Sequence, residues 1–246
     1  MIQYDLKKIK FGTDKATFER GVDLYQGGKV TKFQKGGRVF SAVVLGTKQY
    51  DVFVSERNYD RGECNCYLGQ KEILCKHMIA VAIYAVMDGK QLTEEDQKVT
   101  DELIFSGRIG ELTKEEVSAI KKEITSAMSY IKAYRGPSRI WFSYQSSLQE
   151  GCNRLSYLIS ELPVSKQTAD LLVNLLLRLD RKLSGGVDDS DGTVGGFIYE
   201  VVDVLTKYTE IDCNCIKSFE KILERETMFG WEEPLIRILD EGILQE

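Results

Sequence analysis

The spacing of apolar residues predicts mixed helices and strands in the first third of the chain. Residues 14–26 carry apolar side chains at helical spacing, and Asp14 stands where it can cap a helix. Three segments with alternating patterns follow, and glycine-containing turns separate them at 35–37 and 46–48. These segments, 29–34, 38–45 and 49–55, predict the strands of a small antiparallel sheet.

A continuous apolar run occupies residues 75–87. Its composition predicts a helix that is buried on all sides. The apolar part is ten residues long, whereas a membrane-spanning helix needs roughly 20. We therefore expect a core helix and not a membrane span.

From Thr93 onward the pattern predicts helices alone. Thr93 with Asp96, and Thr113 with Glu116, have the spacing of capping boxes. We expect the helix that begins at Thr113 to continue until Gly136. Further helices are predicted at about 144–161, 165–183, 194–209, 213–227 and 231–242.

Four metal-ligand residues stand within 14 positions, and they include the only histidine of the chain. The cluster, Cys64, Cys66, Cys75 and His77, is a set that suits tetrahedral structural zinc and leaves no position open for a catalytic water. The alternative is scattered reduced cysteines and a core histidine, but this does not explain why all four gather together. The predicted fold class is therefore α+β: a small antiparallel sheet with helices and a zinc site, followed by an all-α helical domain.

The spacing of these ligands fits the predicted elements. Cys64 and Cys66 are two residues apart, so in an extended strand their side chains share one face. Residues 67–74 then form a loop, in which Gly69 is available for a positive φ angle. Cys75 and His77 fall at the start of the predicted core helix.

The pattern C-x-C-x8-C-x-H resembles the SWIM zinc finger, whose signature is C-x-C, a variable spacer and C-x-H. Upstream, Arg20 to Val30 is similar to that family's lead-in, R-G-x-x-x-Y-x-x-G-x-V. The resemblance covers about residues 12–88. It implies DNA binding or protein–protein interaction, commonly in the company of Swi/Snf-type helicase-like ATPases.

Composition and charge indicate that the chain consists of two domains of different net charge. The chain has 246 residues, 43% of them hydrophobic and only three of them proline, which is typical of one large or two small folded domains. Residues 1–90 hold 15 Lys/Arg and 10 Asp/Glu, whereas residues 91–246 hold 18 and 28. We predict domains at 1–90 and 91–246. The asymmetry indicates either a negatively charged partner for the first domain or ordinary scatter in surface charge.

The first residues lack an apolar signal segment, and metal-type cysteines suit a reducing compartment, so we expect a cytoplasmic protein. The acidic segment 187–192 does not align with a calcium loop, because Val187 would take the first ligand position. It is either a loop in which Asp191 or Thr193 caps the next helix or a partner-binding loop. The other cysteines, Cys152, Cys213 and Cys215, are interpreted as core or surface thiols.

Two functions follow from these features. No G-x4-G-K-[ST] loop is present, and the only histidine is assigned to metal, so we expect no enzymatic activity. The isoelectric point near 5.3 favours an adaptor that binds protein. The alternative is direct DNA or RNA binding, with Tyr50, Tyr59 or Tyr67 stacking on bases. Its candidate cations are Lys29, Lys32, Lys35, Arg38, Arg57, Arg61, Lys71 and Lys76.

Overall fold

The computed structural model describes residues 2–99, 103–137 and 141–243. The chain forms two compact units, Met1–Asp101 and Glu102–Glu246, each with its own hydrophobic core. Leu92 is buried in the first core, so the first unit extends past position 90. With this boundary the first unit holds 16 Lys/Arg and 14 Asp/Glu, and the second holds 17 and 24. The first unit is thus only slightly basic.

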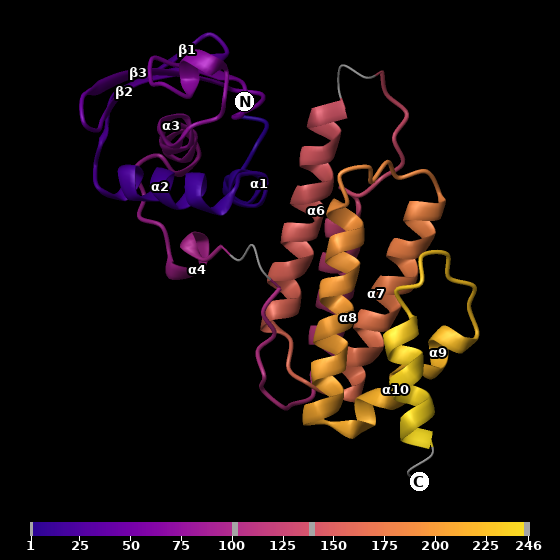
Figure 1. Cartoon of the computed structure of the whole chain (residues 1–246). Helices are drawn as coiled ribbons and strands as arrows, with labels where there is room; N and C mark the ends of the chain where they lie inside the picture. Colours follow the sequence, from indigo (N-terminus) through magenta and orange to yellow (C-terminus); the bar gives the residue numbers. More distant parts are fainter. Residues whose placement is uncertain (1, 100–102, 138–140, 244–246) are drawn as a thin grey trace. The chain divides into compact units, whose positions relative to one another are not determined.

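The first unit packs a four-stranded antiparallel sheet, in the order β1-β2-β3-β4, against helices. Helix α3 contacts both the sheet and helices α1 and α2, and it lies between them (Figure 1). Its residues from His77 to Ile83 are all buried, as the sequence predicts. The elements are α1 (Leu6–Phe11), α2 (Lys15–Gln26), β1 (Val30–Gly36), β2 (Val39–Leu45), β3 (Gln49–Ser55), β4 (Gly62–Cys64), the 3-10 helix η1 (Gly69–Lys71), α3 (Lys76–Met87) and α4 (Glu94–Gln97).

Local chemistry accounts for helix α2 and for the sheet. The Asp14 carboxylate caps α2 by accepting from the backbone N–H of Thr17 at 2.9 Å. In β2, Phe40, Ala42 and Val44 are buried and alternate with more exposed residues, so one face of the strand meets the core. The three predicted strands and the capped helix are confirmed.

Strand β1 contains an irregularity that the sequence does not predict. Its register with β2 shifts between Thr31 and Gln34, and Lys32 has a φ of 50°. An extra residue in an edge strand increases its twist and exposes the bulged side chain. Lys32 therefore projects from the edge of the sheet.

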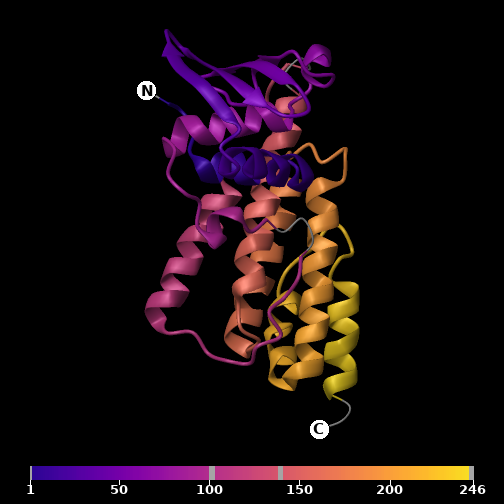
Figure 2. The ribbon, with the colours of Figure 1, turned by 90° about the vertical axis from the view of Figure 1, so that its left-hand side faces the viewer.

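The second unit is helical. Helices α6, α7 and α8 run alongside one another (Figure 1 and Figure 2), and α8 contacts both α6 and α7. The core contains a stripe of leucines on α7, including Leu172, Leu176 and Leu179. The elements are α5 (Lys114–Met128), α6 (Trp141–Glu161), α7 (Lys166–Ser184), α8 (Thr193–Ile211), the 3-10 helix η3 (Cys213–Ser218), α9 (Glu220–Leu223) and α10 (Glu233–Ile243).

Two of the predicted helices differ from the observed ones. Helix α5 begins with the predicted Thr113 capping box but ends at Met128, well before Gly136. There the backbone N–H groups of Ser129, Tyr130 and Ile131 donate to carbonyl oxygens three residues earlier. This is the hydrogen-bond pattern of a 3-10 turn, so the α-helix ends at this point. The predicted helix at 213–227 is replaced by the short pieces η3 and α9, because Asp212 caps a 3-10 turn.

A buried carboxylate holds the segment between α9 and α10. Asp180 of α7 is 3% exposed, and its Oδ1 accepts from Trp231 Nε1 at 2.9 Å and from the backbone N–H of Met228 at 3.2 Å. Hydrogen bonds to charged groups contribute more than those between neutral groups. The segment 224–232 is thereby attached to the helical core.

We expect Asp180→Leu to lower the free energy of unfolding of the second unit by roughly 2–4 kcal/mol, because it leaves the buried indole N–H of Trp231 and the part-buried backbone N–H of Met228 unpaired. Both tryptophans of the chain, Trp141 and Trp231, lie in this unit, so denaturant unfolding followed by tryptophan fluorescence measures it. Asp180→Asn keeps the acceptor oxygen and should lose less. Replacement of the exposed Asp203 with leucine is the control. Equal effects at positions 180 and 203 would contradict this prediction.

Among the residues that the structure describes, no helix has both the length and the apolar character that crossing a membrane requires.

Candidate metal centre

The four predicted ligands converge at one corner of the first unit, and all four side chains are buried. Cys64 is the last residue of β4, and Cys66 lies in the bend that follows. Cys75 is the N-cap of α3, and His77 lies in its first turn. The end of strand β4 and the bend after it thus meet the start of a helix, and the ligand atoms lie within 4.8 Å of one another.

The separations between these atoms fit a tetrahedral zinc ion. His77 Nδ1 lies 3.8 Å from Cys64 Sγ and 3.9 Å from Cys75 Sγ. Ideal Zn–S and Zn–N bonds of about 2.3 and 2.0–2.1 Å give a sulfur–nitrogen edge of roughly 3.5 Å. A small contraction therefore brings the side chains into contact with one ion. The three thiolates and the imidazole would hold it with no ligand position left for water.

Gly69 places the ligand loop against Cys64. A Cβ atom on Gly69 would lie 2.6 Å from Cys64 Cβ and would also overlap the Cys64 carbonyl oxygen. The backbone N–H of Gly69 donates to Cys66 Sγ at 3.3 Å. Gly69 does not adopt a positive φ angle, and Glu72 is the residue of this loop that takes the left-handed conformation, with a φ of 59°. Glycine is needed here for close approach of two chain segments.

An aromatic ring orients the histidine. The rings of Tyr50 and His77 are stacked with their centroids 4.1 Å apart, and Thr47 and Tyr50 share a hydrogen bond of 2.9 Å between their hydroxyl groups. Gly46 comes close to the other ring nitrogen, because a Cβ atom there would lie 3.6 Å from His77 Nε2. The turn between β2 and β3 therefore supports the ligand, a role that the sequence pattern does not reveal.

The cysteines influence one another's protonation. The Cys64 thiol lowers the pKa of Cys75 by hydrogen bonding, and His77 lowers this pKa further, although burial opposes both effects. The same Cys64–Cys75 contact, together with burial, raises the pKa of Cys64. A metal ion binds the thiolate forms, so its binding would release the protons of these thiols.

A groove of about 240 Å³ opens beside the ligands. Its lining includes the cations Arg20 and Lys76 and the aromatic side chains Tyr50 and Tyr67. Tyr67 is 71% exposed, and Lys71 Nζ donates to its hydroxyl at 2.6 Å. Exposed cations and an exposed aromatic ring therefore gather at the metal corner.

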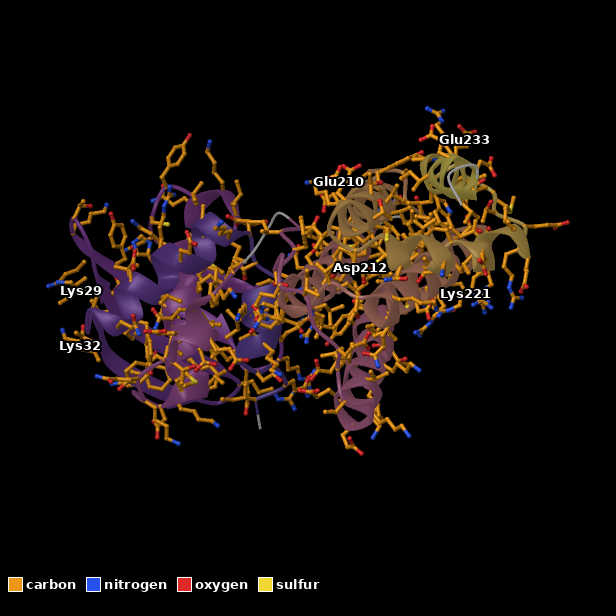
Figure 3. The ribbon with its side chains drawn as sticks, turned by 90° about the horizontal axis from the view of Figure 1, so that it is seen from below. Lys29, Lys32, Glu210, Asp212, Lys221 and Glu233 are labelled. Atoms are coloured by element: carbon orange, nitrogen blue, oxygen red, sulfur yellow. The ribbon has the colours of Figure 1, made fainter. Side chains whose placement is uncertain are left out.

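All eight candidate cations for nucleic-acid binding are exposed, but they lie in separate places. Lys71 and Lys76 flank the metal corner, and Lys29 precedes β1 at that same end of the sheet. Lys32 extends beside Lys29 at the edge strand (Figure 3). The other four cluster at the opposite end of the sheet, near the ends of β1 and β3 and the starts of β2 and β4: Lys35, Arg38, Arg57 and Arg61.

Two of the candidate tyrosines are not available as stacking platforms. Tyr59 is 4% exposed, and Thr13 donates to its hydroxyl at 3.3 Å, so its ring belongs to the core. The ring of Tyr50 is already stacked on His77. Only Tyr67 of the three projects into solvent.

Other predicted features take ordinary structural roles. Among the described residues, the Cys3His cluster is the one group of metal-type ligands found, and Cys213 and Cys215 are outside it. Cys213 is exposed, whereas Cys152 and Cys215 are buried. Two carboxylates cap the first turn of α8. Asp191 Oδ1 accepts from the backbone N–H of Thr193 at 3.1 Å, as predicted, and the Asp189 carboxylate accepts from the backbone N–H groups of Val194 and Gly195 at 2.7 and 2.8 Å.

Comparison with protein families agrees with this geometry. The family model of the SWIM zinc finger matches residues 50–85, which contain most of β3, all of β4, the ligand loop and most of α3. The chain therefore contains a SWIM zinc finger with a Cys3His site. No match was found among curated proteins or among solved structures.

Proposed function

We propose that this chain is a non-enzymatic adaptor, in which zinc stabilises the first unit and the chain mediates a protein–protein interaction. All four ligands are protein side chains and all are buried, so a bound zinc would have a structural role. The only histidine belongs to this set, which leaves none for acid–base or nucleophilic catalysis. The role of the metal is to hold β4, the ligand loop and α3 together.

The arrangement of the candidate cations is the observation that favours a protein partner over a nucleic acid. The eight candidates are divided between two ends of a sheet whose strand β2 has seven residues, a length of about 20 Å. In the distant group, Glu56 forms an ion pair with Lys35 at 3.5 Å. A contiguous basic surface, which phosphate binding requires, is thus interrupted. The resemblance to SWIM proteins supports a Swi/Snf-type helicase-like ATPase as the protein partner.

Salt-dependent binding tests this choice. We expect the full chain to bind labelled duplex DNA and single-stranded RNA no more tightly than non-specific binders, with Kd about 10⁻⁵ M at physiological salt. The slope of log affinity against log salt should be shallow, since each neutralised phosphate contributes only about 0.9 for duplex DNA. Fluorescence anisotropy measures both quantities. Co-purification of a purified Swi/Snf-type ATPase with the full chain, in the presence of nuclease, is the expected positive result.

The groove at the metal corner favours nucleic-acid binding as a second candidate function. Two matched double variants separate the candidates: Lys71→Glu with Lys76→Glu beside the ligands, and Arg57→Glu with Arg61→Glu at the other end of the sheet. An adaptor should show small and equal effects on DNA affinity. Binding tighter than about 10⁻⁷ M that only the first pair abolishes would replace the adaptor proposal with a nucleic-acid site at the metal corner.

A further inference from the structure

The second unit contains an exposed apolar groove of about 450 Å³, which we name the α7–α8 groove. It lies where the end of α7 and the start of α8 meet the segment 228–231. Tyr199 and Phe229 are 53% and 47% exposed, and the neighbouring Met228 is 70% exposed. The apolar residues that line the groove are Leu183, Val187, Ile198, Tyr199, Phe229 and Trp231.

Two aspartates fix the walls of this groove. Asp180 holds the backbone of Met228 and the indole of Trp231, so the wall formed by 228–231 is attached to α7. Asp189 lines the groove and accepts from the first turn of α8. A Cβ atom on Gly195 would lie 3.2 Å from Asp189 Oδ2, so glycine lets this carboxylate approach the helix. The groove is therefore formed before any ligand binds, which lowers the entropy lost on binding.

The segments that form the groove are acidic. Residues 183–203 and 226–235 contain eight Asp/Glu and no Lys/Arg, and of these acids only Glu226 lines the neighbouring groove of Arg181 and Arg225. Asp203 is exposed and lies one helical turn beyond Tyr199. Glu233, labelled in Figure 3, is exposed at the start of α10. Its side chain lies close to Gly230, because a Cβ atom built on that glycine would be 3.6 Å from Glu233 Oε1. Carboxylates thus flank an apolar depression.

Basic side chains just outside these segments are directed elsewhere. Arg181 and Arg225 line a different groove, together with Leu177. Lys182 Nζ donates to the carbonyl oxygen of Ile131. Their charges therefore do not neutralise the lining of the α7–α8 groove.

We propose that the α7–α8 groove binds a basic amphipathic segment of a partner protein, with one large apolar side chain seated against Tyr199 and Phe229. The exposed apolar residues supply the anchor site, and the surrounding carboxylates select lysine or arginine on either side of the anchor. Nucleic acid and anionic membranes are disfavoured by the same carboxylates. This inference rests on the proposed adaptor function, for which it names the class of partner segment.

A synthetic peptide tests the inference on the full chain. The probe is a helix-forming peptide of lysine and alanine that carries tryptophan and leucine four positions apart. One control peptide replaces each lysine with glutamate, and another replaces tryptophan and leucine with alanine. We expect the probe to bind at least tenfold more tightly than either control, as measured by anisotropy of a dye on the peptide.

Variants of the chain locate the binding site. Tyr199→Ser and the pair Asp203→Lys with Glu233→Lys should each weaken probe binding at least fivefold. Two matched controls should leave it unchanged: Leu223→Ser, which replaces a 59% exposed apolar residue outside the groove lining, and Glu123→Lys with Glu210→Lys, an equal charge change on α5 and the far end of α8. Circular dichroism verifies that each variant is folded.

Three results would overturn the inference: equal binding of the three peptides, equal loss in the groove and control variants, or stronger binding of single-stranded oligonucleotides or phosphatidylserine vesicles at this groove. None of these concerns the co-purification of the ATPase. The adaptor proposal would then stand with its partner bound at another surface, so the two failures are distinguishable.

Discussion

Replacing Cys75 with alanine is expected to abolish zinc binding and to unfold the first unit, while the second unit stays folded. Cys75 is 1% exposed and is the N-cap of the core helix α3, so its ligand bond joins that helix to the end of β4. Structural zinc in small finger peptides contributes roughly 10–16 kcal/mol at neutral pH. Typical domains are stable by only about 5–15 kcal/mol in total. The remaining packing should not compensate for this loss.

The two units carry different spectroscopic reporters, which makes this prediction sharp. Both tryptophans belong to the second unit, so their fluorescence should not change in Cys75→Ala. Far-ultraviolet circular dichroism should lose the contribution of the sheet and of α3. Removal of zinc from the unmodified chain by a chelator should produce the same pair of signals.

Elemental analysis provides the independent measurement. The unmodified chain should contain one zinc ion, and Cys213→Ala, which changes an exposed thiol outside the cluster, should retain it. A content of two ions would show that Cys213 and Cys215 also bind metal. The absence of zinc from the purified chain would refute a structural zinc site altogether.

Features that arise from neighbouring residues could be predicted from the sequence. Both capping boxes are present because Thr93 and Thr113 need only a partner three residues away. The ligand set was equally accessible, since Cys64 and Cys66 on one side and Cys75 and His77 on the other are each two residues apart. Only the distance between the two pairs required the folded structure.

Features that depend on contacts between distant segments could not be predicted. Tyr59 looked available for stacking, but its place in the core depends on Thr13 and on the T-shaped packing of Tyr4, 55 residues earlier in the chain. At α8 the adjacent residue Asp191 caps the N–H of Thr193 as predicted, but the second cap was not foreseen, because Asp189 reaches Val194 and Gly195 from five and six residues upstream. Local sequence rules favour near partners, and the fold selected more distant ones.

The charge division shows the same limitation. Residues 91–101 contain four Asp/Glu, and they belong to the first unit because Leu92 is buried in its core and Lys10 Nζ donates to the carbonyl oxygen of Glu95 at 2.6 Å. A boundary drawn from pattern alone assigned these acids to the helical domain. The excess of 15 Lys/Arg over 10 Asp/Glu in residues 1–90 therefore depends in part on where the domain boundary is placed.

The largest effect expected from a residue that is not a ligand is that of Gly69→Ala. The added methyl group would overlap the carbonyl oxygen and Cβ of Cys64, so β4 and the ligand loop would have to separate. Displacement of Cys64 changes the positions of the sulfur atoms around the metal. Loss of supporting contacts in metal sites typically lowers metal affinity by about 10–100-fold, and we expect a decrease of at least this size in competition with a zinc-binding dye.

Two comparisons show whether close approach is the cause. Gly36→Ala is the matched control, because no atom lies within 4 Å of a Cβ at that position and its φ is not positive, so zinc affinity should be unchanged. Gly69→Asn distinguishes between two reasons for glycine. Asparagine tolerates positive φ angles better than alanine does, so a conformational requirement predicts that asparagine partly restores zinc affinity. Because the obstacle is the Cβ atom itself, we expect Gly69→Asn to bind zinc no better than Gly69→Ala, and recovery with asparagine would contradict this explanation.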